Sequence, residues 1–476
     1  PASTFGPDSA AALAGRPLAE TDRILEHLHN LHLLQEPSPE RYVLHDLLRE
    51  YAVDLVDADE RDEALRRLVS FCLRTADRAD RSLNPRRFRL PLPAQPRLPD
   101  VTLADELDWP DTKSVKAWLI AELPGLAAVE NHARTSGMTE EAAWLAHVLA
   151  GHLETEGLWR EAGEMHSAAA DHWHTHGVTL AEAHALLALA SIRIRTGQYP
   201  AATRAADRAL RTARAEGDTR CTAEALEKLA AIHWHQSDLT TAASIQREVI
   251  EIHRNSADRW NLARCLTALG AILLHLGDGE TALTSLTEAR QLVDDLDDSR
   301  LELQILGNLG GLHLSTGNPQ EARKVFERIL SIGKEVLSPN DFATVQLNLA
   351  ASLPLPDESA RAATLYTSAL ETFRALDSRR IEADALNGLG TVHREAGDYA
   401  AALDRHSSAL ELARAIGAQR EEAAALRGLG LAEKALDRIP AALDHLGRAA
   451  ALARQIEAAE EEAYAAEALA ELLGSI

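Results

Sequence analysis

Leucine, alanine and glycine recur at a fixed interval of 40 residues through most of the chain, and polar residues lie between them. One recurring position is leucine in every repeat, at Leu149, Leu189, Leu229, Leu269, Leu309, Leu349, Leu389 and Leu429. The residue after each of these leucines is alanine or glycine, and a further alanine recurs from Ala162 to Ala442. A fixed interval of this kind indicates a repeat protein, which grows by stacking equal units.

Each repeat has the pattern of two helices joined by a tight turn. Around Gly397-Asp398-Tyr399, apolar residues follow helical spacing on both sides, over 386–392 and 402–410. The small residues let the two helices approach closely, and each hairpin completes its core against its neighbours. The sequence therefore predicts an all-α fold: an α-solenoid of eight helical hairpins over 143–456, followed by a capping helix over 457–476. The pattern resembles tetratricopeptide repeats in a long-helix form.

Two features depart from the plain repeat. In the repeat over 349–376, Pro354-Leu355-Pro356-Asp357 replaces the turn glycine, so its first helix must end early and the local curvature is expected to change. Gly388-Leu389-Gly390 and Gly428-Leu429-Gly430 are similar to dinucleotide-binding loops. Both lie inside a helix with no strand before it, so helix packing is the better interpretation.

The first 142 residues have a different pattern. A short helix over 9–15, a helix over 18–31, two strands flanking Pro37-Ser38-Pro39 and a helix from Asp46 predict a partial winged-helix domain over 1–58. A helical connector over 59–142 follows, with helices at 60–83, 112–122 and 125–135 and a proline-rich linker over 84–110. The basic run of the connector could face the acidic body or a missing domain, but a solvated linker is the preferred interpretation; its members are Arg78, Arg81, Arg86, Arg87 and Arg89.

Charge and cysteine content narrow the class of function. Acidic residues outnumber basic ones by 24, which argues against a broad surface for nucleic acid, and the helix over 18–31 is too acidic to enter a major groove. The three cysteines lie far apart and form no disulfide framework, so a reducing cytoplasm is predicted. No apolar stretch is long enough to span a membrane, and none is expected.

No catalytic, cofactor or metal site is predicted within the chain. The pair Gly333-Lys334 precedes Glu335, and Arg328 stands where a phosphate-binding loop needs its first glycine. His172 and His176 are spaced to share one helix face, but two ligands without a third do not make a metal site. The chain is therefore not expected to be an enzyme.

The inner face of the predicted solenoid offers candidate effector contacts. Residues at i, i+3, i+7 and i+10 of a first helix would line it, and several of them are polar: Asp384, Asn387, Thr391, Arg394, Arg427 and Lys434. Asn308 and Asn348 precede the recurring leucine and could bond a peptide backbone. The competing interpretation is an ordinary hydrated surface.

A short run near the N-terminus carries a family resemblance. By itself, Leu44-His45-Asp46 is explained by an acid in the first turn of a helix and a histidine in the loop before it. The run over 41–52 nevertheless resembles the winged-helix end of nucleotide-switch ATPases (NB-ARC type, STAND class) in actinomycete transcriptional regulators, above all the large antibiotic regulatory protein (SARP) family. The stretches 10–15, 80–85 and 117–129 are similar to the same family.

The resemblance implies roles and partners. His45 would reach the β-phosphate of bound ADP and Asp46 would hold the local geometry, with Leu44 in place of the family's usual methionine. The chain would be the sensor part of a regulator whose DNA-binding and ATPase domains precede Pro1. ADP or ATP would bind that upstream domain. A protein, peptide or small-molecule effector would occupy the inner face and favour an assembling state. The alternatives are a plain interaction scaffold and a related switch ATPase with an effector other than DNA.

Overall fold

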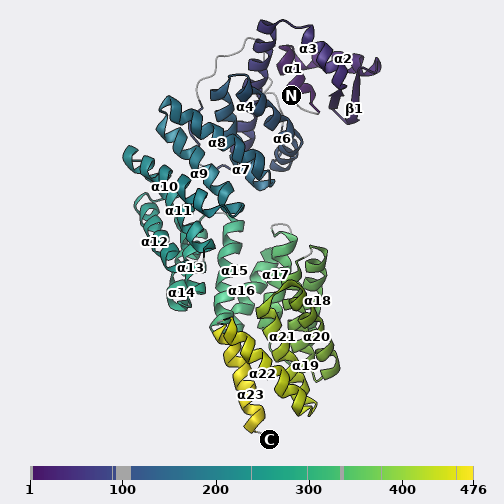
Figure 1. Ribbon diagram of the computed structural model, residues 1–476, viewed down its shortest axis with the longest axis vertical. Helices are drawn as coiled ribbons and strands as arrows, with labels where there is room; N and C mark the ends of the chain where they lie inside the picture. Colours follow the sequence, from purple (N-terminus) through teal and green to yellow (C-terminus); the bar gives the residue numbers. More distant parts are fainter. Residues whose placement is uncertain are drawn as a thin grey trace. The chain divides into compact units, whose positions relative to one another are not determined.

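The computed structural model describes residues 4–87, 89–92, 109–236, 238–296, 298–332, 337–376, 378–456 and 458–474. Most of the predicted linker, over 93–108, and the pair Gly333-Lys334 lie outside these residues. The chain divides into two compact units, Pro1–Ile252 and His253–Ile476, which are described separately. Both consist mainly of helices, so the predicted all-α fold is confirmed (Figure 1). None of the described helices is both long and apolar enough to cross a bilayer.

The first unit begins with a small helical module. Its elements are α1 (Pro7–Ala14), α2 (Leu18–Asn30), the antiparallel pair β1 (Leu34–Ser38) and β2 (Arg41–Leu44), and α3 (Asp46–Asp54). Phe5 forms a bridge with Tyr42, and Tyr42 is buried with Leu25 and Leu34 in a small core. These elements follow the predicted order, and the winged-helix assignment stays a prediction.

The connector contains two long helices, α4 (Ala58–Leu83) and α6 (Thr112–Thr135). The prediction of two separate helices over 112–135 is wrong, because α6 runs through Pro124. A proline removes one helical hydrogen bond. The apolar residues on both sides of Pro124, including Leu119, Leu123 and Leu126, are buried on one continuous helix, and their burial outweighs that loss.

A buried carboxylate anchors the start of the linker. Asp80 on α4 accepts hydrogen bonds from Asn84 (2.9 Å), Arg87 (3.0 Å) and Arg89 (2.6 Å). Arg87 also donates to the carbonyl oxygen of His147 at 2.7 Å. The interpretation of this basic run as a solvated linker is therefore wrong for Arg87 and Arg89, which hold the chain against α4 and the first hairpin.

The rest of the first unit contains three helical hairpins. They are α7 (Thr139–Thr155) with α8 (Trp159–His176), α9 (Thr179–Arg195) with α10 (Tyr199–Glu216), and α11 (Thr219–His235) with α12 (Leu239–Asn255). Within each of the first two pairs the helices pack directly on one another. The helix α12 ends a few residues beyond the boundary between the units.

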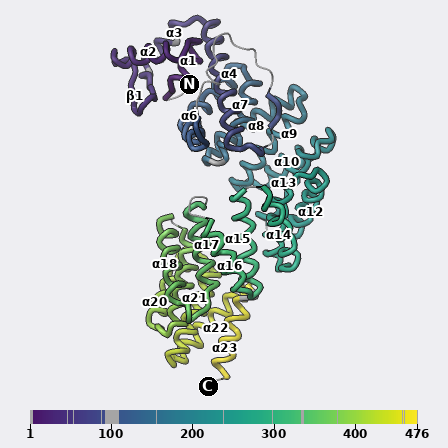
Figure 2. The backbone as a smooth tube through the Cα atoms, turned by 180° about the vertical axis from the view of Figure 1, so that it is seen from behind, coloured from purple at the N-terminus to yellow at the C-terminus, as the bar shows by residue number. Residues whose placement is uncertain are grey.

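The second unit continues with five hairpins and a final helix (Figure 2). They are α13 (Arg259–His275) with α14 (Gly279–Val293), α15 (Ser299–Ser315) with α16 (Pro319–Ile332), α17 (Pro339–Ser352) with α18 (Ser359–Ala375), α19 (Arg379–Glu395) with α20 (Tyr399–Ile416), α21 (Gln419–Ala435) with α22 (Ile439–Gln455), and α23 (Ala459–Gly474). The helix α17 stops at Ser352, before the two prolines, as the sequence predicts. The associated change of curvature stays a prediction.

The small recurring residue makes room for a large side chain of the second helix. A Cβ atom on Gly310 would lie 2.5 Å from the ring of Phe326, and one on Gly270 would lie 2.6 Å from Leu286. Both distances are far below van der Waals contact, so only glycine lets these helices approach so closely. The recurring alanines, such as Ala322, are also fully buried. The packing role predicted for these positions is confirmed.

Candidate functional site

The first helices of successive hairpins form one continuous face in the second unit. Helices α15, α17, α19, α21 and α23 each contact the next in this series. We call the solvent-accessible side of these five helices the inner face. The effector contacts predicted from the sequence all lie on these helices, with Asn308 on α15, Asn348 on α17, Asp384, Asn387, Thr391 and Arg394 on α19, and Arg427 and Lys434 on α21.

Asn387 belongs to the framework of this face. Its Nδ2 donates to the carbonyl oxygen of Glu421 at 3.1 Å, and its Oδ1 lies 3.1 Å from Nδ1 of His406. The amide therefore joins α19 to α20 and α21, and Asn387 is buried. Sequence reasoning missed this role because both partners lie in other helices.

His406 fills the space between two glycines that sequence reasoning assigned to packing. A Cβ atom on Gly428 would lie 2.2 Å from its ring, and one on Gly390 would lie 2.6 Å from it. Burial lowers the pKa of His406 to about 3, and the charges of Arg394 and Arg427 add to this effect. The ring is therefore neutral at pH 7, and its Nδ1–H donates to Asn387.

Asp384 has no ion-pair partner among the described residues. Its carboxyl is accessible to solvent, yet neighbouring helices crowd it. This crowding raises the pKa of Asp384, the charge of Glu421 raises it further, and Arg380 opposes the shift. Arg380 pairs instead with Glu421 at 2.7 Å. Asp384 is thus an acid that makes no ion pair within the described part of the inner face.

The predicted positive charges of the last repeat are neutralised within the fold. Arg427 pairs with Glu461 of α23 at 3.1 Å and lies 5.5 Å from the ring centroid of Tyr464. Lys434 pairs with Glu471 at 3.0 Å. Sequence reasoning missed both partners because they lie in the final helix.

The remaining predicted contacts differ in whether their side chains already form hydrogen bonds or ion pairs within the chain. Arg394 pairs with Glu395 at 2.8 Å, and the Thr391 hydroxyl donates to the carbonyl oxygen of Asn387 at 3.1 Å. Asn308 and Asn348 are half-buried on α15 and α17. Their amides make no side-chain hydrogen bond within the described part of the chain, so their donors and acceptors remain available.

His45 and Asp46 lie at the junction between β2 and α3. The His45 side chain is exposed, and its carbonyl oxygen accepts the first hydrogen bond of α3, from the backbone N–H of Arg49 at 2.9 Å. The side chain of Asp46 lies outside the part that the structure describes. The helix α3 also exposes Leu47 and Tyr51, and Leu55 just after its end is exposed as well; sequence reasoning missed this apolar stripe.

An ion pair joins this module to the connector. Arg41 of β2 pairs with Glu122 of α6, and Arg41 also donates to the hydroxyl of Thr4 at 3.0 Å. Burial raises the pKa of Glu122, whereas the charge of Arg41 lowers it. Arg41 and Glu122 both come from stretches that carry the family resemblance, and the pair fixes β2 next to α6.

The repeats match the family model described as tetratricopeptide repeat, over residues 221–295, 261–335, 341–415 and 381–455. These residues are tetratricopeptide repeats, as the sequence predicts. The chain is also 29% identical over 224 residues to the regulatory protein AfsR of Streptomyces griseus. The aligned region covers 45% of this chain and 22% of AfsR. It is 40% identical over 83 residues to AfsR of Streptomyces coelicolor, and this alignment covers 15% of the chain and 8% of that protein.

These relatives confirm the predicted relationship to antibiotic regulatory proteins, and the chain spans about a fifth of the length of the first of them. Among solved structures, the apo form of the quorum sensor NprR from B. thuringiensis shares the fold, with a TM-score of 0.51 and 15% identity over 71% of this chain and 99% of NprR. A STAND protein with a tetratricopeptide repeat sensor from Pyrococcus horikoshii also matches, with a TM-score of 0.44 and 14% identity. This match covers 99% of the present chain and 61% of the Pyrococcus chain.

Proposed function

We propose that this chain is the sensor region of a transcriptional regulator that switches between ADP-bound and ATP-bound states. The observation that carries the proposal is the similarity to AfsR, which extends over 45% of the chain. In this proposal the repeats restrain an ATPase domain that precedes them in the same polypeptide. An effector on the inner face shifts the population toward the ATP-bound, assembling state. The upstream domains, and not this chain, contact DNA.

The inner face supports binding of an extended peptide or protein segment. The amides of Asn308 and Asn348 can each donate to and accept from a peptide backbone. The carboxyl group of Asp384, which pairs with no arginine or lysine among the described residues, favours a lysine or arginine side chain at its end of the face. Asn387 acts indirectly in this proposal, because it holds the helices on which the other contacts lie.

His45 supports the nucleotide-sensing part of the proposal. Its imidazole is exposed at the start of α3 and makes no side-chain hydrogen bond within the described residues, so it is free to donate to a phosphate oxygen. The Arg41–Glu122 pair would hold β2, and therefore His45, in a fixed position against the connector. The nucleotide itself would bind to the upstream domain.

Affinity for ADP in the longer polypeptide tests the nucleotide-sensing role. Fluorescent ADP is titrated into the wild type, a His45→Ala variant and a His27→Ala control. His27 is another exposed histidine of the same module, so its replacement should leave the affinity for ADP unchanged. We expect His45→Ala to weaken ADP binding about tenfold, the value of one charge-assisted hydrogen bond. Equal affinities in all three proteins would contradict the role of His45.

Peptide binding to the chain tests the role of the inner face. Short peptides of one sequence with lysine, glutamine or glutamate at a central position are titrated into the wild type, Asp384→Asn and an Asp404→Asn control on the outer helix α20. We expect the lysine peptide to bind most tightly and to lose this preference only in Asp384→Asn. A preference for lysine that survives in Asp384→Asn would contradict the assignment. Peptide binding without any nucleotide binding by the longer polypeptide would support the alternative of a plain scaffold.

A further inference from the structure

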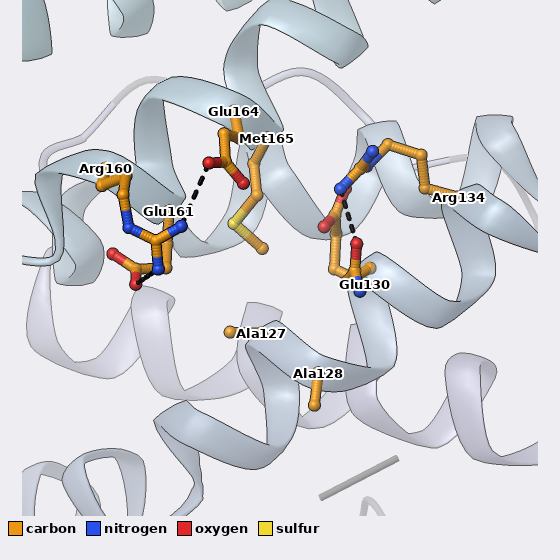
Figure 3. Close-up of a pocket in the computed structure, with 9 residues that line it drawn as sticks. Ala127, Ala128, Glu130, Arg134, Arg160, Glu161, Glu164 and Met165 are labelled. Atoms are coloured by element: carbon orange, nitrogen blue, oxygen red, sulfur yellow. Dashed lines mark hydrogen bonds and ion pairs between the residues drawn. The ribbon is translucent and has the colours of Figure 1, made fainter.

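A cavity of about 270 Å³ lies in the first unit between α6 and α8 (Figure 3). Met165 of α8 points across it toward Ala127 and Ala128 of α6. Charged side chains flank this apolar middle on both sides. The volume lies just below the usual range for small-molecule sites, about 300–1,000 Å³, so the cavity suits a very small ligand and not a protein segment.

The two sides of the cavity each contain an ion pair. On the α6 side, Glu130 is almost fully buried, and Nε of Arg134 donates to it at 3.2 Å. On the α8 side, Arg160 donates to Glu164 at 3.2 Å and to Glu161 at 2.6 Å. In Figure 3, Glu164 and Glu130 lie on opposite sides of Met165.

The carboxylates of the cavity outnumber its cations. Three glutamates and two arginines line it, a formal excess of 3 − 2 = 1 negative charge. Burial raises the pKa of Glu130, the Arg134 charge lowers it, and the Glu164 charge raises it. Arg134 pairs with Glu130, whereas Arg160 is shared between Glu161 and Glu164, so one carboxylate charge is left without a cation of its own and a bound cation would neutralise it.

The shape of the site favours an organic cation over a metal ion. A metal ion needs ligand atoms that converge on one point. Among the described residues that line the cavity, the three glutamates do not bring their carboxylate oxygens within 4.8 Å of one another. An anion is disfavoured because Arg160 already binds two carboxylates and Arg134 binds Glu130. The apolar middle, formed by Met165, Ala127 and Ala128, suits a short alkyl chain.

We propose that this cavity binds a small alkylammonium compound, with its ammonium group between Glu130 and Glu164 and its alkyl chain against Met165. The ammonium donates hydrogen bonds to both carboxylates and so joins α6 to the first hairpin. The site is independent of the inner face, because it lies in the first unit and shares no residue with that face.

Calorimetric titration of the chain tests this site with four probes: butylamine, 1,4-diaminobutane, butyrate and 1-butanol. We expect both amines to bind with one molecule per chain, and butyrate and butanol not to bind. Glu164→Gln removes one carboxylate from a side chain that is largely exposed, so the fold should be unaffected. This variant and Glu130→Gln should each weaken amine binding about tenfold or more.

Glu140→Gln, which changes an exposed glutamate of α7, is the matched control and should bind the amines like the wild type. If Glu130→Gln fails to fold, amine binding by Glu164→Gln alone tests the proposal. The proposal is overturned if the amines do not bind the wild type, if butyrate binds as tightly as butylamine, or if Glu164→Gln binds the amines unchanged.

Discussion

Asn387 and His406 form a buried hydrogen bond of 3.1 Å between a first helix and the second helix of the same hairpin. The same Asn387 amide donates to Glu421 of the next hairpin, so a single side chain connects three helices. The bond also fixes the tautomer of His406, which must carry its proton on Nδ1. A polar residue that sequence reasoning placed on the effector face is thus part of the framework beneath it.

Replacing Asn387 with alanine should destabilise the second unit. The substitution leaves the buried Nδ1–H of His406 and the Glu421 carbonyl oxygen without their partner. Leaving a buried polar group unsatisfied costs about 1–3 kcal/mol, so we expect a loss in this range in the free energy of unfolding by urea. Asn348→Ala is the control: it makes the same change at a half-buried asparagine that bonds nothing within the described chain, and it should cost much less. Equal losses in the two variants would show that the bonds of Asn387 contribute nothing.

Acid should destabilise the first unit through His166. This fully buried ring has its pKa lowered to about 3 by burial and, to a smaller extent, by the charge of Arg87. The unfolded chain takes up a proton near pH 6.5, whereas the folded chain does not until about pH 3. The stability contributed by the neutral ring is complete above pH 6.5 and decreases as the pH falls toward 3.

His166→Leu tests this, because leucine occupies the equivalent positions Leu286 and Leu446. Below pH 6.5 one such histidine contributes a slope of about 1.4 kcal/mol per pH unit. We expect the variant to lose about this much of the slope between pH 6 and pH 4.5, measured by urea unfolding at several pH values. A variant with the slope of the wild type would show that His166 is protonated in the folded chain.

Asp80 should make the first unit sensitive to stronger acid. Burial by itself would raise its pKa, but the imidazole of His152 at 3.4 Å, the hydrogen bond from Asn84 and the charges of Arg87 and Arg89 outweigh burial and lower the pKa to about 2. The stability that this carboxylate contributes is therefore present above pH 3.8 and is lost as the pH falls toward 2.

At pH 7, Asp80→Asn should lower the free energy of unfolding by about 3 kcal/mol, because it leaves Arg87 and Arg89 without their shared partner. Asp77→Asn, one turn earlier on α4, breaks an i,i+4 pair with an exposed arginine and should cost less than about 1 kcal/mol. Comparable losses in the two variants, measured by thermal unfolding, would contradict the anchoring role of Asp80.

Features that repeat along the sequence could be predicted from it, whereas contacts between residues far apart in the sequence could not. The hairpins were predictable because Leu309, Gly310 and Ala322 repeat at a fixed interval, and the packing of one repeat is the packing of all. The pair Arg427–Glu461 was not predictable, because its partners belong to different repeats and no recurring pattern marks them. The continuous helix through Pro124 was missed for a related reason: burial against α4 and α7 decides it, and this burial leaves no local signal.

Gly310 gives the sharpest test of the packing rule that builds the solenoid. An added Cβ atom would lie 2.5 Å from the Phe326 ring, which is itself fully buried and cannot move aside, so Gly310→Ala should lower the free energy of unfolding by about 1–3 kcal/mol. Gly307 and Gly311 lie on the same helix, and a Cβ atom there would meet nothing within 4 Å. Alanine at either position should instead raise the stability by about 0.5–1 kcal/mol through its higher helix propensity. Urea unfolding of the three variants measures the contrast, and a Gly310→Ala variant as stable as Gly311→Ala would show that the two helices can separate at no cost.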